Sequence, residues 1–462
     1  MNSQTLDEKI AASFGELTID KALVRQLNIR DNRSIPSFVE EWLISRFQKS
    51  DKTQQQVYQD ITDFMSKHLP SKNEKNTIKY KLLNGESIVL LDKFEAHIDL
   101  KKGEKRLKIN CLDEDNASIS NEVLDKNQSM LEGGQWGAGR LFVRQENKHN
   151  VIELVEFNPM QSGKVNLANL VKARQQFTTR EWIYLLLRTM GYEPFFYSEE
   201  AQQHLLLRLL PIVQNNLNMM ELAPKGTGKS FIYDNLSRYV NLHSGTISRA
   251  QLFKNLRTQE LGFLGNQHDL LVLDEVQNFT GADEVHAKFK EYLESGRYST
   301  GQEKISSECG LMVLANIDLY AGEPKRSDYI RQLPDMFHDS ALIDRFHGII
   351  AGWKIPRFNT ESAAQGLGIK ADVFGEYLHQ LRTVSQMEFP FGNVPNLRGD
   401  SRDVKAVKRL ATGLSKLLLL NPDDADYEAY VLNPAKDLRA RVRTQLAELD
   451  PHEFDAGLKV SL

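Results

Sequence analysis

The chain of 462 residues contains only two cysteines, Cys111 and Cys309, which lie 198 residues apart. Neither cysteine belongs to a CxxC pair or to a Cys/His run, which argues against a zinc site. Two cysteines are too few for a framework of disulfides, and so low a number favours a reducing compartment.

The sequence also lacks an apolar run long enough to cross a bilayer. Its longest apolar stretches, such as Leu417 to Leu420, are far shorter than the ~20 residues of a membrane-spanning helix. The first residues, up to Phe14, carry acidic side chains and no apolar centre, so they do not resemble a signal peptide. We therefore expect a cytoplasmic chain that has no contact with a membrane.

An excess of charge of one sign is missing as well. The 58 Lys and Arg residues are balanced by 62 Asp and Glu residues, which gives a net charge of −4. Any contact with nucleic acid must therefore come from a local group of cations. The 41% hydrophobic and 26% charged residues are typical of globular proteins and exclude a mainly disordered chain.

The hydrophobic period changes along the chain and predicts its organisation. A helical period is followed by alternation with period two, for example at Phe94, Ala96 and Ile98, and several short strands here favour a barrel of the OB type. In chain order we expect a helical region, a small β domain that is a candidate for DNA binding, an α/β core with leading helices, and a helical lid, at residues 1–83, 84–165, 166–360 and 361–462.

The strongest motif is a glycine-rich loop between an apolar strand and a helix. It matches G-x-x-x-x-G-K-[ST], except that Ala223 stands at the first glycine. The two glycines let backbone N–H groups wrap around phosphate oxygens, the lysine supplies positive charge, and the serine supplies a hydroxyl to Mg²⁺. The motif predicts ATP and Mg²⁺ as cofactors, with contacts from Ala223, Pro224, Lys225, Gly226, Thr227, Gly228, Lys229 and Ser230.

Two further apolar strands end in polar residues. The first ends in Asp274 and Glu275, where Asp274 would hold Mg²⁺ through water and Glu275 would polarise the attacking water. The second ends in Asn316, which is placed to reach the γ-phosphate or the attacking water. Either strand end alone would be unremarkable, but the order behind the phosphate loop predicts one catalytic site.

Two arginines follow these strands. Arg345 is a candidate arginine finger, which must reach the γ-phosphate bound by a neighbouring subunit; the alternative is a surface arginine paired with Asp344. Arg402 begins a predicted lid helix and is a candidate nucleotide contact within its own subunit. An ordinary charge in the first helical turn is the alternative for Arg402.

Two predicted hairpins carry candidate DNA contacts. On the first, five basic residues would cluster at the tip and the outward face and bind phosphates without sequence preference, unless this is simply a solvated turn. On the second, an aromatic ring offers a stacking surface beside two cations, unless this is a simple connecting hairpin of the α/β core. The candidates are Lys101, Lys102, Lys105, Arg106 and Lys108 on the first hairpin, and Arg297, Tyr298 and Lys304 on the second.

These motifs occur in the order found in AAA+ ATPases. The Asp-Arg-Phe at 344–346 resembles the arginine-finger motif of MCM replicative helicases, and residues 292–304 resemble the hairpin that such motors point into their pore. Longer segments resemble the BrxL family, the Lon-related ATPases of BREX phage-defence systems. These segments are SIPSFVEEWL, ELAPKGTGKS, LVLDEVQNF, EYLESGRYSTG, ALIDRFHGIIAGWKIPR and ARVRTQL.

The resemblance implies an AAA+ core in a hexameric or double-hexameric ring that encircles duplex DNA and takes part in blocking phage replication. Other BREX proteins are implied as partners. Longer family members carry a C-terminal Lon-like protease domain, whereas only Leu449 to Leu462 follow the ARVRTQL helix here. We therefore expect ATPase activity and no proteolysis from this chain.

Two other functions remain open on sequence grounds. An AAA+ unfoldase would present an aromatic-hydrophobic-glycine loop, and Gly262-Phe263-Leu264-Gly265 fits that description, although it also fits a turn before the acid-pair strand. A nucleotide-dependent scaffold that hydrolyses slowly and recruits defence proteins is the third hypothesis.

Overall fold

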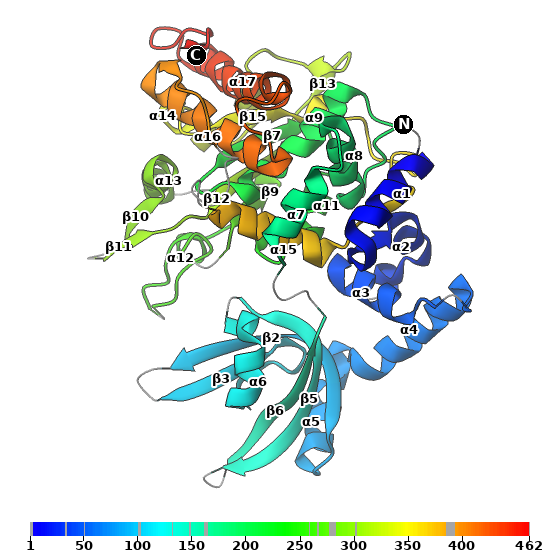
Figure 1. Ribbon diagram of the computed structural model, residues 1–462. Coiled ribbons are helices and arrows are strands. Elements are labelled where there is room, and N and C mark those ends of the chain that lie inside the picture. The colour runs from blue at the N-terminus through cyan, green and yellow to red at the C-terminus, as the bar shows by residue number, and fades with distance from the viewer. Residues whose placement is uncertain are drawn as a thin grey trace. The chain divides into compact units, whose positions relative to one another are not determined.

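The computed structural model of the chain divides into two compact units (Figure 1). Unit 1 comprises residues 1–21, 166–369 and 374–462, and unit 2 comprises residues 22–165 and 370–373. The residues that the structure describes are 3–32, 35–49, 51–99, 103–131, 133–146, 149–160, 165–257, 259–265, 268–276, 283–300, 303–384 and 393–461. In these residues, no helix is both long and apolar enough to cross a membrane.

Unit 2 contains helices followed by a closed barrel with the strand order β2-β3-β4-β6-β5. Alternation explains the barrel, because Phe94, Ala96, Leu107 and Ile109 are all buried in its core, as the period of two predicts. Its elements are α2 (Lys21–Leu27), α3 (Ser37–Phe47), α4 (Gln54–His68), α5 (Lys75–Leu83), β2 (Ile88–Asp99), β3 (Glu104–Ile109), β4 (Glu114–Ile119), α6 (Asn121–Lys126), β5 (Gln135–Glu146) and β6 (His149–Pro159).

Unit 1 begins with helices that lead to a parallel sheet. Thr178 and Glu181 form a capping box at the start of α8, and Glu181 also accepts a 2.6 Å hydrogen bond from Lys9. Thus α1, near the N-terminus, packs with this unit rather than with the helices that follow it in the chain. The leading elements are α1 (Ser3–Phe14), β1 (Thr18–Asp20), α7 (Leu167–Arg174), α8 (Thr179–Thr189), α9 (Glu199–Leu207) and α10 (Leu210–Val213).

The sheet of unit 1 has five strands, all parallel, in the order β15-β7-β12-β9-β8. Three of its strands are apolar runs buried along nearly their whole length, as expected for a sheet that is covered on both faces. The carboxyl ends of the strands meet at one edge, where open α/β sheets bind ligands. The strands are β7 (Asn218–Ala223), β8 (Val240–Ser244), β9 (Leu270–Asp274), β12 (Gly310–Asn316) and β15 (Gly348–Ala351).

Helices and short strands complete unit 1. On the long helix α16, the helical period from Val404 to Leu417 predicts one buried face; Val407, Leu410, Leu414 and Leu417 are buried there, whereas Val404 is half-buried. The remaining elements are α11 (Lys229–Asn235), α12 (Arg249–Leu252), α13 (Asp283–Ser295), β10 (Arg297–Thr300), β11 (Glu303–Ser306), β13 (Leu319–Tyr320), β14 (Glu323–Pro324), α14 (Ser340–Ile343), β16 (Leu367–Ile369), α15 (Ala371–Thr383), β17 (Arg398–Gly399), α16 (Ser401–Leu418), α17 (Asn433–Leu449) and β18 (Val460–Ser461).

Candidate functional site

The glycine-rich loop lies between β7 and α11, at the carboxyl edge of the sheet. Gly226 has φ +87° and Gly228 has φ +70°, a left-handed conformation that side chains disfavour. Thr227, between them, is buried, and its hydroxyl has no hydrogen-bond partner among the described residues. A buried hydroxyl without a partner is costly, so the loop fits a bound group that brings hydrogen-bonding atoms.

Lys229 meets the end of the neighbouring strand. Its Nζ donates to Asn316 Oδ1 at 2.8 Å and to Pro224 O at 3.3 Å. The register places Asn316 directly beside Ala223, because β12 pairs with β7 in parallel. Burial lowers the pKa of the Lys229 ammonium, and an anion at the loop would offset that effect.

Ser230, at the start of α11, contacts the last residue of β9. Its hydroxyl donates to Asp274 Oδ2 at 2.5 Å, although the two residues are 44 positions apart in the sequence. A hydroxyl and a carboxylate are oxygen ligands of the kind that Mg²⁺ prefers. Within the described residues no three His, Cys, Asp or Glu side chains could hold a metal by themselves, so the ion would also need phosphate and water oxygens.

Glu275 follows Asp274 with an unusual backbone. Its φ is +51°, and its N–H donates to Asp274 Oδ1 at 2.9 Å. Non-glycine residues with positive φ are uncommon and often mark functional sites. The turn leaves the Glu275 side chain exposed directly after the half-buried Asp274.

A buried ion pair contacts the backbone of the phosphate loop, and it was not identified from the sequence. Arg208 and Glu221 are fully buried, with Nη2 to Oε1 at 2.6 Å and Nε to Oε2 at 2.9 Å. Arg208 also donates to the Thr227 carbonyl at 3.2 Å and to the Tyr192 hydroxyl at 2.8 Å. An acid inside the apolar strand before the loop was the available signal, since a buried carboxylate requires a partner.

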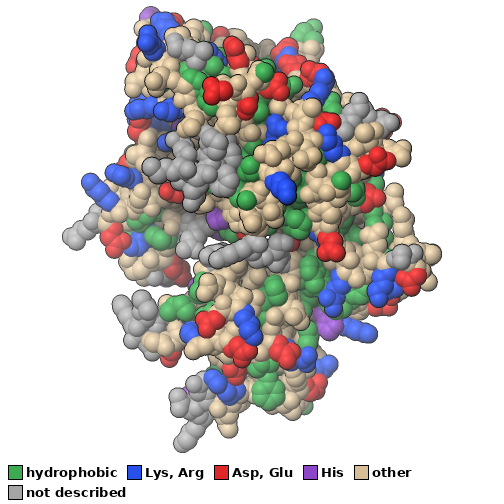
Figure 2. Space-filling model, in the orientation of Figure 1, with side chains coloured by type: hydrophobic (Ala, Val, Ile, Leu, Met, Phe, Trp, Pro, Cys, Tyr) green, Lys and Arg blue, Asp and Glu red, His purple; other side chains and the backbone are tan. Residues whose placement is uncertain are grey.

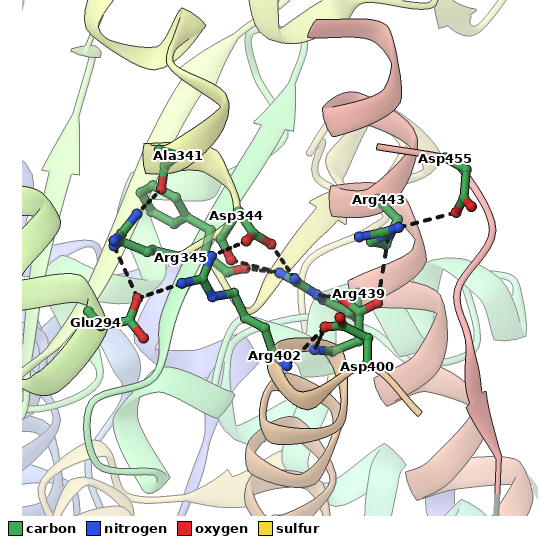
Figure 3. A network of polar contacts seen from close by, with 11 residues as sticks. Glu294, Ala341, Asp344, Arg345, Asp400, Arg402, Arg439, Arg443 and Asp455 are labelled. Atoms are coloured by element: carbon green, nitrogen blue, oxygen red, sulfur yellow. Dashed lines mark hydrogen bonds and ion pairs between the residues drawn. The ribbon is translucent and has the colours of Figure 1, made fainter. Parts of the chain in front are cut away.

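Arg345 and Arg402 lie together in a polar network (Figure 3). Both guanidinium groups converge on Glu294, at 3.1 Å from Arg345 Nε and 3.2 Å from Arg402 Nη2. Arg402 also pairs with Asp344, whose other oxygen is bound at 2.6 Å by the buried Arg439.

This network lies at the amino edge of the sheet, opposite the phosphate loop. His347, two residues after Arg345, donates its N–H to Asn218 O at 2.8 Å, where β7 begins. The loop follows Ala223, where β7 ends, about 17 Å further along at roughly 3.3 Å per residue. The expectation that Arg402 contacts nucleotide within its own subunit is therefore wrong in this structure, because Arg402 is bound at the other edge.

A cavity of about 320 Å³ opens beside the network. Arg345 and Arg402 line it together with Lys405, Lys408 and Arg409. His347 also lines it, and burial next to Arg409 lowers the pKa of this histidine to about 3, so it stays neutral near pH 7. The acids Glu294 and Asp344 also line the cavity, but the five basic side chains outnumber them, so the balance of charge favours an anionic ligand.

The β10–β11 hairpin separates the three predicted DNA contacts. Its register places Arg297 and Lys304 on one face and Tyr298 on the other. Both cations are exposed, whereas Tyr298 is fully buried and donates its hydroxyl to Phe253 O at 2.9 Å. The stacking role expected for Tyr298 is thus corrected: its ring packs in the core of unit 1.

The barrel hairpin shows a less compact basic group than expected. Lys101 and Lys102 lie outside the described residues. Lys105 shares a face with the buried Leu107, whereas Arg106 and Lys108 share the opposite face, because side chains alternate along β3. The cations therefore do not all lie on the outward face.

Acidic side chains accompany the two outward cations of this hairpin. Arg106 pairs with Glu104 at 3.1 Å, and Lys108 lies 4.0 Å from Glu95. On the face drawn in Figure 2, Lys and Arg side chains are likewise mixed with Asp and Glu.

Comparisons with known proteins cover nearly the whole chain. Residues 152–459 match the family model "Lon-like protease BrxL-like, ATPase domain", and residues 12–142 match "BREX system Lon protease-like protein BrxL N-terminal". Two similar curated proteins are both named Lon-like protease BrxL. The one from Escherichia coli O9:H4 (strain HS) is 29% identical over 97% of this chain, and the one from Bacillus cereus (strain H3081.97) is 29% identical over 98%.

The aligned region spans 66% of the Escherichia coli protein and 68% of the Bacillus cereus protein, so the chain corresponds to about two thirds of these relatives. The ATPase-domain match alone includes the phosphate loop, the acid pair, Asn316 and both arginines. Two family models that follow one another along the sequence place this chain in the BrxL family.

Proposed function

We propose that this chain is a Mg²⁺-dependent ATPase of the AAA+ type. One observation carries the proposal: the first residues of α11 meet the ends of two parallel strands, with Lys229 on Asn316 of β12 and Ser230 on Asp274 of β9. Chance placement of a glycine loop would not bring a lysine, a hydroxyl, a carboxylate and an amide together. Membership in a family whose model is an ATPase domain supports the same reaction.

Each side chain has a distinct task in this proposal. Lys229 supplies positive charge to the β- and γ-phosphates, and Ser230 and Asp274 would hold Mg²⁺, which neutralises phosphate charge. Glu275 accepts a hydrogen bond from the attacking water and orients it. The Asn316 amide can donate to the γ-phosphate or the water while its carbonyl oxygen holds Lys229.

Two variants test the ATPase proposal. Glu275→Gln should bind ATP normally and lose turnover, because the water loses its orienting carboxylate while Lys229 still holds phosphate. Lys229→Ala should lose ATP binding itself. Binding is measured by titration calorimetry and turnover by phosphate release, and normal hydrolysis by Glu275→Gln would reject the assignment.

The amino-edge network supports assembly into a ring. Arg345 and Arg402 lie too far from the loop of their own subunit, so both would act on nucleotide bound by a neighbour. The cation-lined cavity beside them suits the phosphates of that nucleotide. We propose a hexameric or double-hexameric ring on this basis.

Duplex DNA is the proposed partner of the ring, which would encircle it and could translocate along it. The proposed role is BREX defence against phage in the cytoplasm, with other BREX proteins as further partners. The exposed Arg297 and Lys304 share one face of a hairpin and can contact phosphates. The OB-like barrel offers Arg106 and Lys108 on one face as a second contact.

A gel shift on nonspecific duplex DNA at two salt concentrations tests this partner. Arg297→Glu with Lys304→Glu should weaken binding and flatten the salt slope by about 2 units, one per lost phosphate contact. Arg326→Glu is the matched control, because Arg326 is an exposed arginine of unit 1 that pairs locally with Asp328. Unchanged affinity and slope in the double variant would remove this hairpin from the DNA site.

The unfoldase hypothesis is less favoured by the packing of residues 262–265. Phe263 and Leu264 donate backbone hydrogen bonds to residues 251 and 252, and the Leu264 side chain is fully buried. A loop that grips a substrate must expose its aromatic and apolar side chains. The rate of ATP hydrolysis distinguishes the scaffold hypothesis from a DNA-driven motor. A scaffold should hydrolyse ATP slowly and without stimulation by DNA, whereas DNA should stimulate a motor.

A further inference from the structure

The segment after β15 lies against the phosphate loop. Gly352 approaches so closely that a Cβ there would stand 2.5 Å from Ala223 Cβ. Phe358 then donates its N–H to Gly226 O at 2.9 Å, and its ring packs on that of Tyr192. These contacts hold the segment beside the loop at the carboxyl edge of the sheet.

Arg357 is the cation that this segment brings to the loop. Its side chain is exposed, and its Cγ and Cδ atoms lie 3.9 Å from the position of a Cβ on Gly226. Within the described part of the chain, no hydrogen bond or ion pair engages its guanidinium group. Arg345 and Arg402, by contrast, are bound by carboxylates at the opposite edge.

We propose that Arg357 binds the phosphates of the nucleotide held by the loop of its own subunit. This inference rests on the proposed function, because it needs a nucleotide at the loop. A guanidinium group offers several N–H donors in a fixed plane and binds phosphate oxygens in pairs, which a lysine cannot do. Arg357 therefore takes the cis role that sequence reasoning gave to Arg402.

The loop geometry explains why an arginine fits here. The aliphatic part of the Arg357 side chain lies at about van der Waals distance from Gly226, because a Cβ on this glycine would stand 3.9 Å from Arg357 Cγ and Cδ. The hydrogen bond from Phe358 keeps the backbone in place, which leaves only the side-chain torsions to be ordered when phosphate binds.

Affinity measurements test the proposal. Arg357→Gln should weaken ATP binding about tenfold or more and reduce its salt dependence, with adenosine binding unchanged. Arg357→Lys should fall between, because the charge remains and the paired geometry is lost. Lys354→Gln is the matched control, since Lys354 is a cation of the same segment that pairs with Glu323 at 2.7 Å.

Mixing experiments decide between cis and trans action. Subunits with Arg357→Gln and subunits with Lys229→Ala should not restore each other, because both changes damage the site of the subunit that carries them. Recovery of turnover in mixed rings would place Arg357 in trans and overturn the proposal. Wild-type affinity of Arg357→Gln for ATP would overturn it as well, whereas failure of the unchanged protein to bind ATP would overturn the ATPase proposal first.

Discussion

Arg345 and Arg402 share one carboxylate oxygen, Oε2 of Glu294, at 3.1 Å and 3.2 Å (Figure 3). The two arginines come from segments 57 positions apart, yet they form one site at the amino edge of the sheet. Glu294 is the last acid of α13, just before the β10–β11 hairpin. In the isolated chain, Glu294 therefore pairs with the two guanidinium groups that would bind a neighbour's phosphates in the proposed ring.

Mixed rings should reveal that Arg345 acts across a subunit boundary. Arg345→Ala alone should lose roughly 10³-fold or more of the ATPase rate, and Lys229→Ala alone should be nearly inactive. When the two variants exchange subunits, part of the activity should return, because some interfaces join an intact loop to an intact arginine.

The control for this mixing experiment is a chain that carries both changes. Mixed with Arg345→Ala, it should restore nothing, because no interface then has an intact arginine. Full activity of Arg345→Ala alone would show that Arg345 plays no part in hydrolysis, and Arg402 would become the candidate.

Asn316→Ala should lower the turnover number roughly 10- to 100-fold, the value of a lost hydrogen bond to a charged group. The amide that positions Lys229 and the γ-phosphate is removed, while the loop that binds ATP stays intact. The ATP affinity should therefore change much less than turnover. Asn316→Asp should also be slow, because it keeps the oxygen that Lys229 contacts but loses the N–H donors and adds negative charge near phosphate. Turnover at the normal rate in either variant would contradict the assigned role.

Arg208→Met should destabilise unit 1 by about 3–5 kcal/mol, the usual cost of leaving a buried charge without its partner. The fully buried Glu221 would remain without a counter-charge beneath the loop. Urea unfolding measures the change, and Arg208→Met combined with Glu221→Leu should recover much of the loss. A double variant that is less stable than Arg208→Met would show that the pair contributes more than mutual neutralisation.

Glu40 should make unit 2 less stable as the pH rises from 4.5 to 7. Burial raises the pKa of its carboxyl to about 7, so the folded chain keeps a proton that the unfolded chain releases near 4.5. The cost is absent below pH 4.5 and complete above pH 7.

Glu40→Gln tests this pH dependence. The amide oxygen can still accept the 2.8 Å hydrogen bond from Ile29 N–H, and the ionisation is removed. Thermal unfolding should show the variant gaining stability over the unchanged chain between pH 5 and pH 8. A difference that stays constant over this range would contradict the shifted pKa.

Local features explain which parts of the site could be predicted. Gly226, Gly228 and Lys229 lie within four consecutive residues, so one loop and one helix start suffice to arrange them. Asp274 and Asn316 were predicted at strand ends because a polar residue directly after a buried apolar run marks the point where the strand leaves the core. The barrel followed from alternation in the same way, since a period of two places every second side chain in the core.

Exposure and long-range partners were harder to predict. Tyr298 looked like a stacking surface, but a ring at that register position gains more from burial against Phe253 than from contact with water. Arg402 begins a helix as expected, yet which edge of the sheet it reaches depends on how α16 packs. The support from Arg208 was missed because its partner Glu221 lies on another element.

The order of the residues in the chain therefore specifies the chemistry of the phosphate loop, the strands that carry its partners and the alternating barrel, because each depends on neighbours a few positions away. Packing adds the strand order that brings Asn316 and Asp274 to the loop, and it separates Arg345 and Arg402 from that loop by the length of β7. The reason is physical: contacts between distant segments depend on which apolar faces pair in three dimensions, and no local period encodes that choice.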